Sequence, residues 1–310
     1  MRGLAGAAIE SRPPALPDGG AFDEFAAASR AGLEAALFRN LPSPGRNAGR
    51  LREAVEEAAL SGGKRLRPLV ALAAGDLVRA KPAGPLAVAV AVEYVHAASL
   101  VLDDLPSMDD AVRRRGKPAL HLAYGVATAE LAAVTLLSRA FEILARESVI
   151  PPALRSRISG ELAAAAGAAG CCGGQAADLA ADPTATNLDD LEAIHASKTG
   201  ALFVAAVRGG ALAGGARESS LQALTFYARN LGLAFQITDD LLDLQGDPET
   251  LGKDTHRDAH RANFATILGP DSARQLVAEL LDSAVAALVP FRRRGAVLAD
   301  LARFVRDRRS

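Results

Sequence analysis

The chain has 310 residues, of which 50% are hydrophobic and only 4% are aromatic. This length allows one large buried core, and the abundance of Ala, Leu, Glu and Arg favours helices over strands. The 35 basic and 36 acidic residues leave a formal charge of -1, which excludes a chain-wide attraction to nucleic acid. Any site for a polyanion must therefore be local, and we expect no nucleic-acid partner.

Residues 1–20 have neither the basic start nor the apolar core of a signal peptide, and their Pro and Gly content predicts a mobile tail. We therefore expect a cytoplasmic protein in which residues 21–310 form a single domain. The most apolar stretch, 83–102, is long enough to span a membrane, but it contains Glu93 and His96 and runs into two aspartates. These polar residues favour a buried core helix, so we expect no membrane span.

Apolar residues recur at helical spacing along most of the chain, and glycines and prolines separate the periodic stretches. No stretch alternates convincingly as a strand. One apolar stripe consists of Leu131, Val134, Leu137, Phe141 and Leu144. The pattern predicts an all-α fold, a single-domain bundle of about ten or more helices. The expected helical segments are residues 22–40, 48–61, 67–80, 84–105, 126–148, 152–172, 188–213, 217–245, 271–289 and 294–307.

Two acidic clusters each follow an apolar stretch. In DDLPSMDD, Pro106 is expected to end the preceding helix near Leu105, so that Asp109 can fold back toward Asp103. In DDLLD, the aspartates are spaced three and four apart and share one helical face. Massed carboxylates repel one another, so each cluster is either a solvated acidic cap or a cation site. Oxygen ligands without His or Cys suit magnesium. The candidate metal ligands are Asp103, Asp104, Asp109, Asp239, Asp240 and Asp243.

Basic residues supply the other half of a possible diphosphate site. GGKRLRP places Lys64, Arg65 and Arg67 after a Gly-Gly turn, which can let backbone amides approach a diphosphate. Arg114 and Arg115 follow the first acidic cluster. Either basic group alone could be ordinary surface, but together with the two acidic clusters they favour a local site for diphosphates and magnesium.

These motifs resemble those of the trans-isoprenyl diphosphate synthase family over about residues 50–255. DDLPSMD and DDLLD resemble its two aspartate-rich motifs, and GGKRLRP resembles its isopentenyl diphosphate motif. RRGKP, GGQAADL, SKTGALF and GLAFQITDD also match, in order. The resemblance implies helices around a central cavity, of the isoprenoid synthase type. It also implies condensation of isopentenyl diphosphate with an allylic diphosphate, a homodimer, and two or three Mg²⁺ ions with substrate bound.

The resemblance further implies roles for individual residues. Isopentenyl diphosphate would be held by Gly63, Lys64, Arg67, His96 and Arg115. The allylic substrate would meet Arg114 and the catalytic residues Lys198, Thr199, Gln236 and Lys253. From the residues alone, His96 could equally be a satisfied core imidazole, and Thr199-Gly200 could merely kink a helix. The resemblance places a chain-length pocket at Ala98 and Ser99, whose small side chains leave its floor open. Geranylgeranyl diphosphate is then the leading product, and farnesyl diphosphate is the alternative.

Other functions share parts of this pattern. A terpene cyclase needs only one diphosphate site, and a head-to-head squalene or phytoene synthase binds two allylic substrates, so GGKRLRP opposes both. A non-catalytic partner subunit is a further alternative, because RANFAT at 261–266 replaces a stretch that is usually rich in lysine. The two intact acidic motifs oppose this alternative, because such subunits usually lose acidic residues. The departures at Leu102, Ala111 and Val112 remove no principal ligand.

Overall fold

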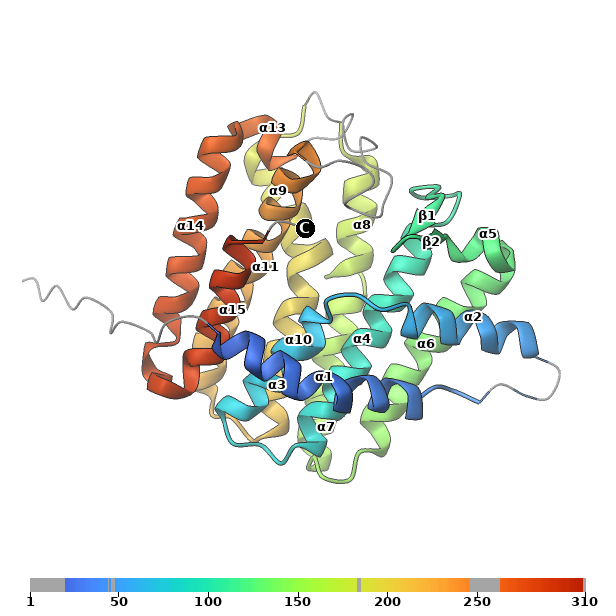
Figure 1. Cartoon of the computed structure of the whole chain (residues 1–310), viewed down its shortest axis with the longest axis horizontal. Helices are drawn as coiled ribbons and strands as arrows, with labels where there is room; N and C mark the ends of the chain where they lie inside the picture. Colours follow the sequence, from blue (N-terminus) through green and yellow to red (C-terminus); the bar gives the residue numbers. More distant parts are fainter. Residues whose placement is uncertain (1–19, 44, 46–47, 183–184, 246–262, 309–310) are drawn as a thin grey trace, which may run out of the picture.

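The computed structural model describes residues 20–43, 45, 48–182, 185–245 and 263–308 (Figure 1). The expected mobile tail therefore lies almost entirely outside the described residues, as does Lys253. Within the described ranges the chain is a bundle of helices with one short antiparallel hairpin, β1 (Arg113–Arg114) and β2 (Lys117–Pro118). The prediction of an all-α fold is confirmed.

The described helices follow the expected segments closely. The elements are α1 (Ala21–Arg39), α2 (Gly49–Leu60), α3 (Leu66–Leu77), α4 (Ala83–Asp103), α5 (Leu120–Tyr124), α6 (Val126–Arg146), α7 (Pro152–Ala166), α8 (Cys171–Ala180), α9 (Leu188–His195), the π-turn η1 (Ala196–Gly200), α10 (Ala201–Ala213), α11 (Glu218–Gln245), α13 (Phe264–Leu268), α14 (Pro270–Ala287), the 3₁₀ turn η3 (Val289–Gly295) and α15 (Ala296–Arg306).

Two expected segments are divided in the structure. The segment 152–172 ends as α7 at Ala166, and α8 begins only at Cys171, because Gly167 and Gly170 adopt non-helical backbone angles. The segment 188–213 is interrupted by the π-turn η1 between α9 and α10. The short helices α5 and α13 were not predicted, since five residues are too few for a periodic pattern.

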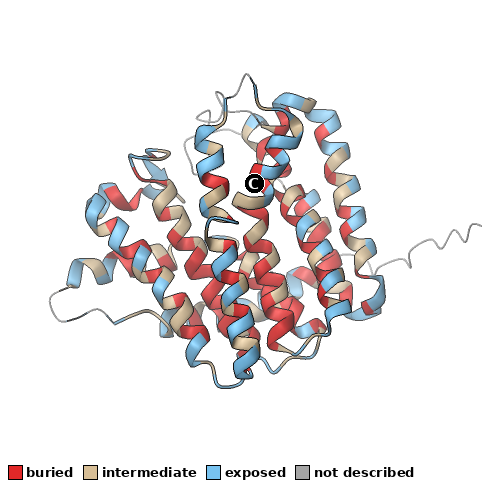
Figure 2. Ribbon diagram, turned by 180° about the vertical axis from the view of Figure 1, so that it is seen from behind, coloured by how far each residue is buried: buried red, intermediate tan, exposed pale blue. Residues whose placement is uncertain are grey.

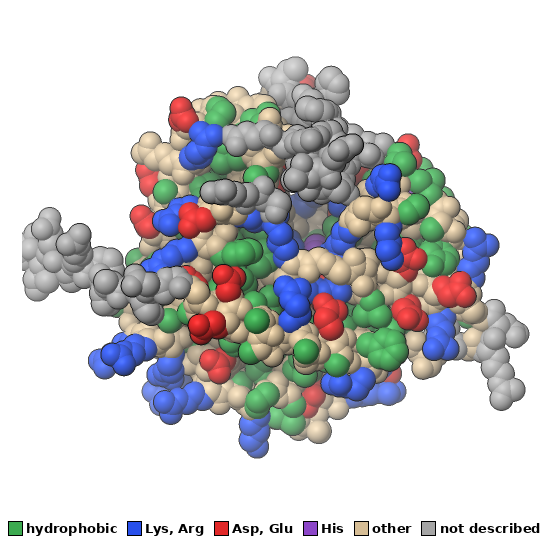
Figure 3. Space-filling model, in the orientation of Figure 1, with side chains coloured by type: hydrophobic (Ala, Val, Ile, Leu, Met, Phe, Trp, Pro, Cys, Tyr) green, Lys and Arg blue, Asp and Glu red, His purple; other side chains and the backbone are tan. Residues whose placement is uncertain are grey.

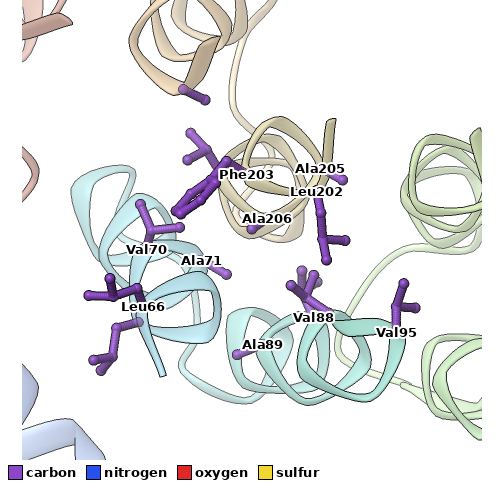
Figure 4. Packing of buried hydrophobic residues seen from close by; sticks show 14 of the residues in the cluster. Leu66, Val70, Ala71, Val88, Ala89, Val95, Leu202, Phe203, Ala205 and Ala206 are labelled. Carbon is purple, nitrogen blue, oxygen red and sulfur yellow. The ribbon is translucent and has the colours of Figure 1, made fainter. Parts of the chain in front are cut away.

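Helices α3, α4 and α10 form the centre of the bundle, with their apolar side chains interleaved (Figure 4). Small residues let these helices approach closely. A Cβ atom at Gly210 of α10 would lie 2.0 Å from the carbonyl oxygen of Ala71 in α3. Figure 2 shows the buried residues along the facing sides of the central helices. The close packing gives the functional end of the bundle a rigid base.

The apolar stretch predicted to be a core helix is α4. It is the one helix in the described residues that is long and apolar enough to cross a membrane, and 72% of its most apolar window is buried inside the bundle. Glu93 and Tyr94 are buried in its middle. The helix ends at Asp103, two residues before the expected end at Leu105, so the first acidic cluster begins at its C-terminus.

Candidate active site

A cavity of about 510 Å³ opens at the end of the bundle where α4 ends. Figure 3 shows a hollow in this face, with a histidine in its depth and Lys and Arg side chains around it. Residues from seven separate parts of the chain line the cavity, from the start of α3 to Arg308 after α15. The predicted site residues among them are Gly63, Lys64, Arg67, His96, Ser99, Asp103, Arg114, Arg115, Lys198, Thr199, Gln236, Asp239 and Asp243.

Acidic residues line two walls of this cavity. Asp103 lies at the end of α4, and Asp239 and Asp243 lie on α11. The backbone N–H of Asp109 donates to the carbonyl oxygen of Asp103 at 2.9 Å, so the loop folds back as expected. The pKa of Asp103 is raised to about 6, chiefly by burial and also by the carboxylates of Asp109 and Asp104, against the opposing charges of Lys198 and Arg114.

These carboxylates fit a magnesium site in their chemistry. The described residues contain no cluster of three acidic, His or Cys side chains close enough to hold a metal, so the ligands would come from facing walls. A cation already stabilises one of them, since Nη1 of Arg308 donates to Oδ1 of Asp239 at 2.7 Å. Asp103, Asp239 and Asp243 are the residues that would hold Mg²⁺, whose preferred ligands are carboxylate oxygens and water.

Two other predicted metal ligands have protein partners instead. Asp104 is buried and forms an ion pair with Arg114 of the hairpin. Asp240 is also buried, and its two oxygens accept hydrogen bonds from Nε2 of Gln236 at 2.9 Å and from the backbone N–H of Phe264 at 3.0 Å. In this structure Asp104 fixes the hairpin and Asp240 fixes the start of α13, and neither lines the cavity.

The Gly-Gly turn joins the two predicted basic groups. Gly62 and Gly63 have positive φ angles of 83° and 112°, which favour glycine. The guanidinium of Arg115 donates to the carbonyl oxygen of Gly62 and, at 3.0 Å, to Oγ of Ser61. A Cβ atom at Gly63 would lie 2.9 Å from Cζ of Arg115. The turn therefore holds Arg115 against Gly62 and Gly63, a role that the sequence did not indicate.

Arg67 is a half-buried cation whose guanidinium lies over two aromatic rings. Its Cζ lies 4.7 Å from the ring centroid of Phe203 and 5.9 Å from that of Phe235. Among the described residues no carboxylate pairs with it, and its buried Nε has no hydrogen-bond partner. Burying a charge in this way is unfavourable unless an anion binds to it. Arg67 is therefore a candidate ligand for an anion.

His96 lies next to Arg67, with Nε2 and Nη1 separated by 3.4 Å. Burial, together with the positive charges of Arg67, Arg115, Arg114 and Arg65, holds the pKa of His96 well below its usual value. The imidazole is therefore neutral at physiological pH, and one of its nitrogens can accept a hydrogen bond.

The π-turn η1 carries Lys198 and Thr199 to the cavity. Nζ of Lys198 donates to Oδ2 of Asp178 at 2.6 Å, and Oγ1 of Thr199 donates to Oε1 of Gln236 at 2.9 Å. The kink that Thr199-Gly200 suggested thus takes the form of an extra residue in the helical turn, a feature common at functional sites.

The structure separates the two residues predicted for the chain-length pocket. Ser99 precedes Asp103 by four positions, so it lies on the same face of α4 and lines the cavity about one helical turn, or roughly 6 Å, below Asp103. Ala98 is rotated away from that face, is only 3% exposed and does not line the cavity.

Several residues that shape the site have roles that the motifs did not predict. Asp178 holds Lys198, Arg308 pairs with Asp239, and Arg65 forms an ion pair with Glu93. Two of these had a signal: Asp178 belongs to the motif GGQAADL, and Glu93 is the one acidic residue in an apolar stretch of 20 residues. Arg308 had none, because only the fold brings the C-terminal segment to the cavity.

Comparison with known proteins identifies the family of the chain. The family model described as polyprenyl synthetase matches residues 49–273, which include both acidic clusters and both basic groups. The chain belongs to the polyprenyl synthetase family. It is thus a trans-prenyltransferase, and the family resemblance that the motifs predicted is confirmed.

Individual relatives of this prenyltransferase differ in their named products. It is 46% identical over 237 residues to farnesyl diphosphate synthase of Escherichia coli, covering 75% of this chain and 79% of that one. It is 37% identical over 278 residues to the chloroplastic geranylgeranyl pyrophosphate synthase 12 of Arabidopsis thaliana, covering 87% and 77%. The similarity therefore establishes the class of enzyme and leaves the product open.

Solved structures match nearly the whole chain. An FPP/GFPP synthase from Zymomonas mobilis has a TM-score of 0.83 and 36% identity, covering 92% of this chain and 98% of that one. A geranyltransferase from Helicobacter pylori, complexed with magnesium and isoprenyl diphosphate, has a TM-score of 0.80 and 29% identity, covering 92% and 96%.

Proposed function

We propose that this prenyltransferase joins isopentenyl diphosphate to an allylic diphosphate and that its main product is geranylgeranyl diphosphate. The observation that carries the proposal is the cavity itself, in which the acidic residues Asp103, Asp239 and Asp243 face the same space as Lys64 and Arg67. The acidic wall would bind the cations of one diphosphate, and the basic wall would bind a second diphosphate. A site for a single substrate would not need both walls.

The two substrates are assigned to different sides of the cavity. Lys64, Arg67, Arg115 and the neutral His96 would hold isopentenyl diphosphate, because all four line the cavity and Arg67 contacts His96 there. The allylic diphosphate would contact Arg114, Lys198, Thr199 and Gln236. Asp104 holds Arg114 in place, and Asp178 holds Lys198. Lys253 stays assigned to the allylic side from the family resemblance alone.

The reaction requires the allylic carbon–oxygen bond to break before the new carbon–carbon bond forms. Two or three Mg²⁺ ions, when bound by the acidic walls, would draw negative charge from the departing diphosphate. Lys198 would donate hydrogen bonds to the same oxygens as their charge grows. The double bond of isopentenyl diphosphate, held by Arg67, would then attack the allylic cation. A proton then leaves the condensed chain to complete the product, and the released pyrophosphate accepts it.

Apolar side chains below the diphosphate region would enclose the hydrocarbon chains and exclude water. Leu100, Leu202 and Phe235 line this part of the cavity. Water that reached the allylic cation would convert it to an alcohol, so a dry wall is part of the chemistry. The small side chain of Ser99 leaves depth for a growing chain, which supports a product longer than farnesyl diphosphate.

A homodimer and a cytoplasmic location complete the proposal. Two residues of the predicted apolar stripe on α6, Leu131 and Val134, are 56% and 58% exposed, while Leu144 at its other end is buried. A second copy of the chain would cover this exposed part, since adjacent exposed apolar side chains commonly mark an interface. Light scattering of the purified protein measures the mass that distinguishes monomer from dimer.

The direct test is an assay of the purified protein with isopentenyl diphosphate, magnesium and allylic starters of increasing length, with products separated by size. Geranylgeranyl diphosphate as the main product supports the proposal. Farnesyl diphosphate as the end product would establish the alternative. Absence of turnover with every starter would favour the non-catalytic partner subunit, which the altered segment 261–266 had suggested.

We expect Ser99→Phe to shorten the main product by one five-carbon unit. The new ring would fill the cavity about one helical turn below Asp103 while leaving the diphosphate region open. Product distribution at matched substrate ratios measures the change. Ala98→Phe is the comparison: if it shortens the product while Ser99→Phe does not, the chain runs behind α4 and our assignment of the floor is wrong.

We also expect the catalytic efficiency with isopentenyl diphosphate to fall above pH 8. Burial, followed by the charge of Arg308, lowers the pKa of Lys64 to about 8, while Asp239 raises it slightly. Deprotonation removes a charge that the diphosphate needs, so kcat/KM should decline about tenfold per pH unit once Lys64 is mostly neutral. Lys64→Arg should move this decline to higher pH, and Lys117→Arg at the exposed hairpin should not.

A further inference from the structure

Arg65 belongs to the basic motif and borders the cavity, but its guanidinium is bound to protein groups. Its backbone is left-handed, with φ of 55°, and the residue is only 3% exposed. Nη1 donates to Oε1 of Glu93 in α4 at 2.5 Å, and Nε donates to Oε1 of Glu34 in α1 at 3.0 Å. Nη2 donates to the carbonyl oxygen of Ala59 in α2 at 3.1 Å. One side chain thus fixes the start of α3 to three other helices.

Its partner Glu93 faces two ways. One carboxylate oxygen accepts from Arg65, while the other is buried and has no hydrogen-bond partner among the described residues. Glu93 also lines the cavity, where Arg67 and Arg115 lie close enough to affect it electrostatically. A carboxylate so placed would attract these arginines and repel a diphosphate. Its charge therefore acts against anion binding unless another cation balances it.

We propose that Arg65 is a positioning residue for the isopentenyl diphosphate site: by pairing with Glu93 inside the protein, it leaves Arg67 and Arg115 available to the substrate. Arg115 is held separately by Ser61 and Gly62, and Arg67 by the rings of Phe203 and Phe235. Neither arginine has a carboxylate ion pair among the described residues. This arrangement rests on the proposed function for the identity of the anion.

The test compares Arg65→Met, Glu93→Gln and the double variant. In Arg65→Met, Glu93 loses its balancing charge and is expected to pair with Arg67 or Arg115, so KM for isopentenyl diphosphate should rise at least tenfold. KM for the allylic diphosphate should change less than threefold. Adding Glu93→Gln to Arg65→Met removes the competing carboxylate, and KM for isopentenyl diphosphate should return to within about threefold of the wild-type value.

Arg79→Met is the matched control, because Arg79 also has a left-handed backbone, with φ of 60°, but is exposed at the other end of α3. It should leave both KM values unchanged. Equal losses for both substrates in Arg65→Met, or a double variant as impaired as the single one, would overturn the proposal. Melting temperatures, measured on all variants, separate these effects from loss of the fold.

Direct binding separates this inference from the proposed reaction. Calorimetry with isopentenyl diphosphate or inorganic pyrophosphate, in the absence of an allylic substrate, measures the affinity of each variant. The expected order of affinities is that Arg65→Met binds more weakly than the wild type and that the double variant recovers most of the wild-type affinity. If that order holds in a protein without turnover, the proposed function fails while the role of Arg65 stands. If turnover is normal but the order is absent, the role of Arg65 is rejected.

Discussion

Asp103→Asn should lower kcat by a factor on the order of 10³ while leaving the helical fold intact. Asparagine keeps the shape of the side chain but removes the negative charge that would attract Mg²⁺ at the end of α4. The loss should appear mainly in kcat, because the basic residues that hold isopentenyl diphosphate are unchanged. Asp76→Asn, which changes an exposed aspartate at the end of α3, is the control.

The same substitution should stabilise the magnesium-free protein at neutral pH. Because the pKa of Asp103 is raised from 3.8 to about 6 in the fold, ionising it disfavours the folded state as pH rises through that interval. Above pH 6 this unfavourable contribution is fully present, and Asp103→Asn removes it. A higher melting temperature at pH 7.5, with little difference at pH 4, is expected. Near-normal turnover in Asp103→Asn would reject the metal assignment.

The helices themselves could be predicted because their signals are local. Apolar periodicity and punctuation by Gly and Pro located α1, α4, α6 and α11 to within two residues at each end. The breaks at Gly167–Gly170 and at η1 could not be placed, because they depend on how neighbouring helices pack. At η1 the chain accommodates one more residue per turn between α9 and α10, and no periodicity in SKTGALF encodes that change.

The site was predictable to the extent that its motifs were contiguous. The motifs GGKRLRP and DDLLD contain residues that the fold brings into one cavity. The same motifs did not distinguish residues that face the cavity from those that support it. Asp104 and Asp240 stand next to cavity residues in sequence but are buried against protein partners, and Arg65 borders the cavity while its guanidinium is paired with carboxylates. Their roles follow from helix rotation and from partners distant in the sequence, which no single motif contains.

The contact between α8 and η1 is an example of such support. Gly174, within GGQAADL, is buried where α8 packs against the π-turn. A Cβ atom there would lie 2.2 Å from the backbone nitrogen of Lys198 and 2.6 Å from its Cα. Backbone atoms cannot rotate out of the way as a side chain can. The motif thus combines two functions: Gly174 lets η1 approach, and Asp178 one turn later holds Nζ of Lys198.

Gly174→Ala should therefore lower kcat by about 100-fold, because a displacement of about 1 Å at a catalytic group can have an effect of that size. The methyl group must push η1 away from α8, moving Lys198 and Thr199 relative to the allylic diphosphate. KM for isopentenyl diphosphate should change little, since Arg67 and Arg115 lie on other elements.

Gly160→Ala is the matched control, because a Cβ atom at that exposed position of α7 meets nothing within 4 Å. It should keep full activity and gain slightly in stability through the higher helix propensity of alanine. Full activity of Gly174→Ala with an unchanged melting temperature would show that the π-turn tolerates the shift and that its exact position does not govern the reaction.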